Sequence, residues 1–224
     1  QNNFKYFDHY AKSFKAEGVD ITGQDKDGRA KSLEILLLQP ALADVLLLFL
    51  ETLLTRSLDY KSIPIIEILC SYYQQTNQPK KLIALYIKYA SVLIAISEIE
   101  EAEKNTNMAF DLLTEEPDLN LLLNAYTRAG DIALNKNHLT AAMTAFSTAF
   151  DLAKQTKNEK DIEMCRKNIG FVHYRSKRHT EALDCYQQNL AYAQRVGDKR
   201  SLAEALANIA TIQSEKGLQQ AAIT

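Results

Sequence analysis

The sequence repeats itself at a fixed interval of about 40 residues, and self-similarity at such a period is the signature of repeat architectures. The tetrapeptide Ala109-Phe110-Asp111-Leu112 returns one interval later as Ala149-Phe150-Asp151-Leu152. Small residues recur at the same interval in two series: Ala90, Gly130, Gly170 and Ala210, then Ala102, Ala142, Ala182 and Ala222. We therefore expect a stack of similar units in which each unit contacts its neighbours.

The composition indicates that these units are helical. Strong helix formers dominate the 224 residues, whereas Gly (7) and Pro (4) are scarce. The net charge of −2 implies no bulk electrostatic attraction to nucleic acid or to an anionic membrane. The sequence therefore predicts an all-α protein without a nucleic-acid partner.

Three cysteines do not define a scaffold. Cys70, Cys165 and Cys185 are too few and too irregularly spaced for a disulfide framework or a zinc site. We expect them to pack as small apolar side chains, and a pairing of Cys165 with Cys185 stays open. The compartment stays unknown, with the cytoplasm preferred.

Apolar spacing at helical period predicts a series of helices. They cover residues 2–17, 29–38, 41–57, a stretch from about 62, 79–95, 98–113, 118–135, 139–155, 159–176, 179–195 and 198–216. Ser97 with Glu100 fits a capping box, and Pro64 fits the first turn of its helix. Gly197 fits a helix C-terminus, and Gly217 fits a turn before a further helix.

A membrane span is not expected within this segment. The apolar stretch from Leu33 to Leu54 is interrupted by Glu34, Pro40 and Glu51. Charged residues and a proline inside such a run favour buried helices packed against protein over insertion into a bilayer.

The small-residue pattern resembles that of the tetratricopeptide repeat (TPR) family. In that family two antiparallel helices form each repeat, and small residues at three places let helices approach closely. The three places read Ala90/Ala102/Ala109, Gly130/Ala142/Ala149 and Gly170/Ala182/Asn189, and the incomplete fourth repeat gives Ala210/Ala222. Asn189 stands where a small residue is usual, Arg166 where a bulky apolar residue is usual, and Thr106 where an aromatic residue is common.

The resemblance implies a right-handed superhelical solenoid of helix hairpins. A period of 40, against about 34 for the commonest form, is similar to the long-helix variety. That variety occurs in kinesin light chains, Leu-Gly-Asn-type polarity adaptors and bacterial Rap-type regulators.

Three segments follow from this frame. Residues 1–40 form a helical segment, 41–78 a degenerate repeat or cap, and 79–224 the TPR-like repeats. The repeats are expected at about 79–117, 118–157, 158–197 and 198–224. The last repeat stops inside its second helix, so we expect the natural protein to continue beyond Thr224. Uncovered repeat ends leave self-association open.

The resemblance also implies a peptide-binding groove lined by the first helix of each hairpin. By this resemblance, ten residues are expected to line that groove: Lys88, Asn124, Arg128, Asp131, Lys167, Asn168, Phe171, Tyr174, Arg175 and Asn208. Lys88, Arg128, Asn168 and Asn208 occupy one position in successive repeats. An Asn amide can both donate to and accept from a peptide backbone, whereas Lys and Arg favour a partner with acidic character. The alternative is that these are ordinary solvated residues, and that Tyr174 packs between repeats.

No motif in the sequence points to catalysis, a metal or a cofactor. There is no Gly-rich phosphate loop, no Gly-x-Ser-x-Gly and no Cys–His constellation. The four histidines lack ligand spacing, and the loop around Asp25 and Asp27 lacks the further oxygen ligands of a calcium site. We therefore expect no enzyme activity.

Two functions remain open. The first is a scaffold that binds a peptide or helix of a partner protein in the groove. The second is a sensory or regulatory segment of a larger signalling protein, whose kinase, cyclase or transcription-regulator output domain lies outside this chain.

Overall fold

The protein is entirely helical where its structure is described. The computed structural model describes residues 2–22, 26–55 and 59–221, and within these ranges it contains eleven α-helices and no strand. The chain divides into two compact units, Gln1–Pro117 and Asp118–Thr224, called here the N-terminal unit and the C-terminal unit. The predicted all-α class is confirmed.

The N-terminal unit is built from six helices. They are α1 (Asn2–Ala16), α2 (Lys26–Leu38), α3 (Pro40–Thr55), α4 (Asp59–Gln75), α5 (Pro79–Ala95) and α6 (Ile99–Glu115). Phe49 of α3 holds α1 in place, since its ring lies 4.9 Å from that of Tyr10 and 5.6 Å from that of Phe14. Glu67 of α4 forms an ion pair with Arg29 of α2 and accepts a hydrogen bond from the Tyr89 hydroxyl of α5 at 3.1 Å.

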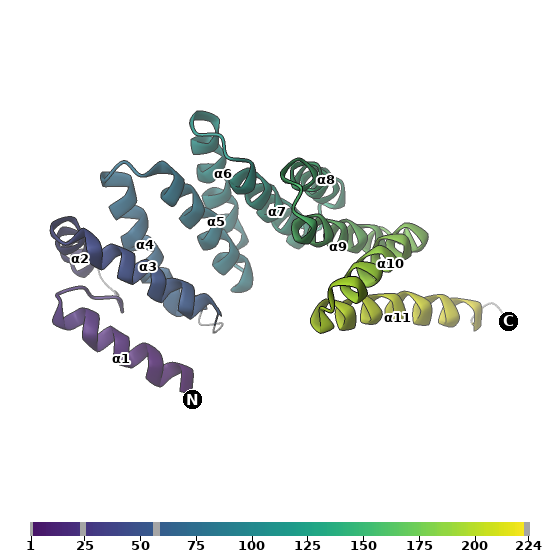
Figure 1. Cartoon of the computed structure of the whole chain (residues 1–224), viewed down its shortest axis with the longest axis horizontal. Coiled ribbons are helices and arrows are strands. Elements are labelled where there is room, and N and C mark those ends of the chain that lie inside the picture. Colours follow the sequence, from purple (N-terminus) through teal and green to yellow (C-terminus); the bar gives the residue numbers. More distant parts are fainter. Residues whose placement is uncertain (1, 23–25, 56–58, 222–224) are drawn as a thin grey trace. The chain divides into compact units, whose positions relative to one another are not determined.

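The C-terminal unit is a regular succession of helices. It contains α7 (Leu119–Asn135), α8 (Leu139–Thr156), α9 (Glu159–Arg175), α10 (His179–Val196) and α11 (Lys199–Ala221), each packed against the next (Figure 1). Phe146 of α8 is fully buried with Ala133 of α7 and Val172 of α9. Tyr186 of α10 is buried with Ala182 and with Ile212 of α11. Each core cluster therefore joins one hairpin to the next helix.

The repeat period is also present in the turns. Ser97, Asn137 and Lys177 adopt left-handed conformations with φ of 66°, 58° and 60°, and each lies just before the second helix of a hairpin. Non-glycine residues adopt this conformation at a cost of about 1 kcal/mol. The same tight connection is therefore used in these three hairpins, whichever side chain occupies it.

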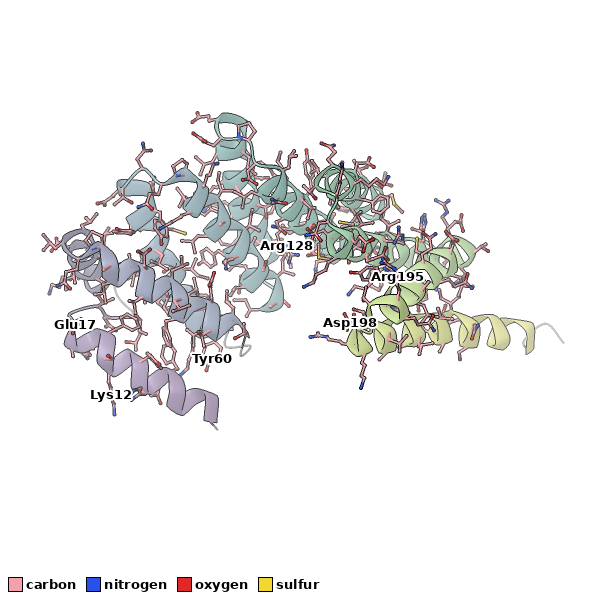
Figure 2. All side chains as sticks on the ribbon, in the orientation of Figure 1. Lys12, Glu17, Tyr60, Arg128, Arg195 and Asp198 are labelled. Atoms are coloured by element: carbon pink, nitrogen blue, oxygen red, sulfur yellow. The ribbon has the colours of Figure 1, made fainter. Side chains whose placement is uncertain are left out.

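The hairpins of the C-terminal unit also begin in the same way. Asp118, Asn158 and Asp198 lie one repeat period apart at the N-caps of α7, α9 and α11, and the Figure 2 label marks Asp198 at the start of α11. Each side chain accepts hydrogen bonds from main-chain N–H groups two and three residues later, at 3.0 to 3.4 Å. These bonds satisfy donors that a helix start leaves open. Gly197 ends α10 with φ of 71°, as predicted.

Three local predictions are wrong. The capping box at Ser97 does not form, because Ser97 is in the left-handed turn and α6 begins only at Ile99, after Glu98. Pro64 lies inside α4 rather than in its first turn, since α4 begins at Asp59. The turn at Gly217 is absent, because α11 continues to Ala221. Asp25 and Ala222 lie outside the described residues.

The apolar stretch from Leu33 to Leu54 is divided between two helices. Within the described ranges, no single helix combines the length and apolar character needed to cross a membrane. The segments Asp27–Leu38 and Pro40–Thr55 meet that test only as a pair, and a bend of 119° separates them.

Gly130 and Gly170 belong to the series of small residues that recurs every 40 residues. Because glycine has no side chain, aromatic rings can approach the helix backbone at these two positions. A Cβ atom added to Gly130 would lie 2.5 Å from the ring of Phe146, and one added to Gly170 would lie 3.0 Å from the ring of Tyr186. Phe146 is fully buried, so its ring has little freedom to move away. The absent methyl group is therefore a packing requirement at Gly130.

We expect Gly130→Ala to lower the free energy of unfolding by about 1–2 kcal/mol, because overpacking outweighs the gain in helix propensity of about 1 kcal/mol. Urea denaturation followed by circular dichroism measures this. The matched control is Ala90→Gly at the same position of the N-terminal unit, where a buried methyl is already accommodated. That change should also destabilise, by about 1 kcal/mol. A Gly130→Ala protein as stable as the parent would show that Phe146 can shift.

Candidate functional site

A cavity of about 560 Å³ lies in the C-terminal unit, bounded by α9, α10 and α11. Its size is within the usual range of ligand sites, about 300–1,000 Å³. The side chains that line it come from all three helices and from the cap of α11: Lys160, Asp161, Glu163, Met164, Lys167, Tyr186, Asn189, Tyr192, Asp198, Arg200, Ser201, Glu204, Ala205 and Asn208. The lining groups are amides, hydroxyls, charged groups and apolar surfaces, which can hydrogen-bond to a ligand and pack against it.

An ion pair connects the two helices on either side of this cavity. Lys167 Nζ of α9 lies 3.0 Å from Glu204 Oε2 of α11, and Arg200 Nε lies 3.1 Å from the other oxygen, Oε1. The hydrogen bond from Lys167, followed by that from Arg200, lowers the pKa of the Glu204 carboxyl below its ordinary value. Both cations are therefore committed to one carboxylate.

Asn189 of α10 lies on the cavity with an unused acceptor. Its Nδ2 donates to the main-chain oxygen of Glu163 at 2.8 Å and to Glu163 Oε2 at 2.9 Å. Both partners are acceptors, so the amide can only be oriented with nitrogen toward them. Its Oδ1 is buried and accepts no hydrogen bond from the part of the chain that the structure describes. The remaining oxygen of Glu163 is ion-paired with Arg166.

The structure brings two of the ten predicted groove residues to this cavity, Lys167 and Asn208. Asn168 is half-buried on α9 and does not line it. Asn124 is exposed on α7. Neither Asn168 nor Asn208 has a side-chain hydrogen bond to any described residue.

Lys88 and Arg128, two of the predicted basic residues, are paired with carboxylates. Lys88 of α5 lies 3.0 Å from Glu51 of α3 in the N-terminal unit. Arg128 lies 3.2 Å from Asp131, one turn along α7, and Figure 2 labels Arg128 on that helix. Burial raises the pKa of the Asp131 carboxyl, and the Arg128 charge opposes that shift.

The remaining predicted residues lie toward the end of α9. The Tyr174 hydroxyl donates to Glu215 of α11 at 2.5 Å, and its ring packs beside Tyr186 and Ile212. Tyr174 therefore packs between successive hairpins, which is the structural alternative given for it. Phe171 is exposed, and Arg175 covers its ring at 5.9 Å while donating to Asn137 at 2.9 Å.

Sequence reasoning missed several residues of the cavity. Glu163, Tyr186, Asn189, Tyr192 and Arg200 were not among the predicted groove residues. The TPR resemblance placed groove residues only on the first helix of each hairpin, whereas Tyr186, Asn189 and Tyr192 lie on α10, which is a second helix. The sequence did contain one indication of a site on α10, because Asn189 is polar at a position that holds alanine in the two preceding repeats.

The described residues contain no group of three or more His, Cys, Asp and Glu side chains that could hold a metal ion. All three cysteines are free, so Cys165 and Cys185 are not paired. Burial raises the pKa of the Cys165 thiol to about 12, which keeps it protonated near neutral pH.

Comparison with known proteins finds one family match, in the C-terminal unit. Residues 163–224 match the family model described as tetratricopeptide repeat, and this stretch contains α10, α11 and most of α9. The resemblance to the TPR family is thus confirmed, with the match covering the helices that bound the cavity. No curated protein matches the chain.

Solved structures share the fold at low identity. A signal transduction ATPase with numerous domains (STAND) protein from Pyrococcus horikoshii, which has a tetratricopeptide repeat sensor, is 13% identical with a TM-score of 0.70, over 84% of this chain and 29% of that one. Aspartyl phosphate phosphatase F from Bacillus subtilis is 15% identical with a TM-score of 0.70, over 87% and 52%. A Rap protein complexed with competence and sporulation factor is 14% identical with a TM-score of 0.64, over 84% and 58%.

These likenesses confirm the fold class, a TPR-type solenoid of helix hairpins. The chain spans less than two thirds of the length of each of the three proteins. The activities of those longer proteins therefore cannot be assigned to this chain from the likeness alone.

We expect Lys167→Met to raise the pKa of Glu204 toward its ordinary value, because the largest cause of its lowering is removed. A pKa lowered in the folded state stabilises the fold above the unfolded-state pKa, and this contribution disappears as pH falls through the folded-state value. A carboxyl-detected NMR titration measures the shift. Lys160→Met is the control, since Lys160 lines the same cavity but makes no ion pair with a described residue. Equal shifts in both variants would contradict the assignment.

Proposed function

We propose that this chain is a protein-interaction module that binds an extended peptide of a partner protein along α9 and α11 of the C-terminal unit. The observation that carries the proposal is the cavity between these helices, lined by Lys167 and by an Asn208 amide that has no described partner. TPR-type repeats build extended concave binding surfaces from their first helices, and the fold is shared with proteins of that kind.

The chemistry of Asn208 suits a peptide main chain. A primary amide offers two donors and an acceptor, so it can pair with the N–H and the C=O of one extended residue. Such contacts hold a backbone whatever its side chains, and neighbouring pockets then supply specificity. The cavity beside Asn208 is a pocket of that kind.

The predicted acidic character of the partner stays a prediction. It depends on Lys88 and Arg128, and each of these already has a carboxylate partner in Glu51 or Asp131. A partner carboxylate would have to compete for them. Self-association through the repeat ends likewise stays a prediction.

A second candidate is a sensory segment of a larger signalling protein. Its support is the likeness to the STAND protein with a tetratricopeptide repeat sensor, of which this chain spans 29%. Under this proposal the same cavity receives the signal, and binding acts on a domain outside the chain. An output domain fused after Thr224 and assayed for activity with and without peptide separates the two candidates.

We expect Asn208→Ala and Asn168→Ala to weaken peptide binding while leaving thermal stability nearly unchanged, because neither side chain is bonded to a described residue. Peptides are selected from a displayed random nonapeptide library on the immobilised protein and titrated by fluorescence anisotropy. Loss of one hydrogen-bonding amide should reduce affinity about tenfold.

Asn107→Ala on α6 is the matched control, since Asn107 is an exposed asparagine on the second helix of a hairpin. It should leave affinity unchanged. Unaltered affinity in the Asn208 variant would refute the assignment of the groove, and a large fall in melting temperature would show that the side chain is structural.

A further inference from the structure

We infer that Asn189 determines which peptide side chain enters the cavity, by accepting a hydrogen bond through Oδ1 from a side chain that bears N–H donors. Glutamine, asparagine, arginine and lysine carry such donors, whereas glutamate and aspartate do not at neutral pH. The inference rests on the proposed function, and it adds the chemical class of the bound side chain.

The unused acceptor is the first observation. Asn189 is 8% exposed, and its Oδ1 accepts nothing from the described residues. A buried polar atom without a partner is costly, and native structures rarely leave one in that state. Because Nδ2 is held by two acceptors of Glu163, the amide cannot rotate to satisfy Oδ1 internally. Oδ1 itself is covered in the described structure, so a ligand donor reaches it only when neighbouring side chains of the cavity wall move aside. Both bonds from Nδ2 to Glu163 can then stay in place.

The surroundings of Asn189 favour a donor over a carboxylate. Glu163 presents its main-chain oxygen and its carboxylate beside the amide, so this wall of the cavity is rich in acceptors. Glu163 is already ion-paired with Arg166. Lys167 is likewise paired with Glu204. A ligand carboxylate beside Asn189 would therefore face acceptors, and both Arg166 and Lys167 are already paired. Lys160, at the start of α9, lines the cavity without an ion pair to a described residue.

The amide is not needed for packing. The positions equivalent to Asn189 in the two preceding repeats are Ala109 and Ala149, and both are fully buried. Alanine thus satisfies the structural requirement of this place in the same chain. The larger polar side chain adds a hydrogen-bonding group at the one repeat where the cavity lies.

The cavity also accommodates the stem of a long side chain. Met164, Tyr186 and Tyr192 line it with apolar surface. Glutamine, arginine and lysine each combine an apolar stem with a tip that carries N–H donors, and such stems pack on apolar surface while the tip stays hydrogen-bonded.

The experiment uses four pools of N-acetylated, C-amidated heptapeptides with a fixed central residue, glutamine, arginine, glutamate or leucine, and mixed flanking residues. Each pool is titrated into the ¹⁵N-labelled chain, and affinity is taken from chemical-shift changes on α9, α10 and α11. We expect the glutamine and arginine pools to bind about tenfold more tightly than the leucine pool, and the glutamate pool to bind most weakly.

Three variants separate this inference from the proposed function. Asn189→Ala should bring the glutamine and arginine pools down to the affinity of the leucine pool and should fold normally, as alanine does in the equivalent positions. Asn189→Ser provides a second small variant, and circular dichroism checks the fold of both. Asn208→Ala should weaken all four pools alike, because it removes contact with the peptide main chain.

Equal discrimination in the parent and in both Asn189 variants would overturn the inference while leaving the proposed function standing. Tightest binding of the glutamate pool would overturn it as well. Absence of any shift on α9 and α11 with all pools would overturn the proposed function and the inference together.

Discussion

The close approach of paired helices at one small residue is the constraint on which the hairpins depend. Gly130 faces the ring of Phe146, and one repeat later Gly170 faces the ring of Tyr186. In the N-terminal unit the same two places hold Ala90 and Thr106, both buried. Where Ala90 replaces the smaller glycine, the residue in the place of the ring is Thr106, which is smaller than the phenylalanine or tyrosine of the later repeats. The departure at Thr106 from the TPR pattern follows from this complementarity of volumes, and its hydroxyl is satisfied by the Ala102 main-chain oxygen at 2.8 Å.

The other two departures from the repeat pattern belong to one polar network. Arg166 stands where an apolar residue is usual and Asn189 where a small one is usual, and both contact Glu163. The Arg166 guanidinium also lies over the ring of Phe150 at 5.6 Å, which lets a charged group occupy a largely apolar setting. Arg166 on α9 and Asn189 on α10 thus both contact Glu163, a residue that lines the cavity. A deviation from a repeat is most informative when a second deviation lies next to it in space.

Sequence reasoning described the helices from Pro79 to Val196 well, because the apolar period that predicted them is a local property of the sequence. Its errors were also local. Ser97 and Glu100 have the residue types of a capping box, but tertiary packing of the hairpin requires a left-handed turn at Ser97. Pro64 and Gly217 suggested helix boundaries, and the helices run through both.

The candidate site was less predictable, for a physical reason. The ion pairs Lys88–Glu51 and Lys167–Glu204 each join two helices through residues 37 positions apart, which is not the period of the sequence repeat. Whether such an ion pair forms depends on how far one helix is shifted along its neighbour. The 40-residue sequence period does not specify that shift. For the same reason the family frame identified Lys167 and Asn208 but gave no indication that α10 contributes to the cavity.

The Lys167–Glu204 pair gives the cavity a sensitivity to ionic strength. The two side chains are 44% and 39% exposed, so dissolved ions reach them. At a physiological Debye length of about 8 Å, an exposed pair of this kind contributes about 0–1 kcal/mol and is weakened further as salt is added. Because the pair joins α9 to α11, added salt weakens one connection between these two helices. Electrolyte thus acts on the charged part of the cavity lining and leaves its apolar walls and buried amide in place.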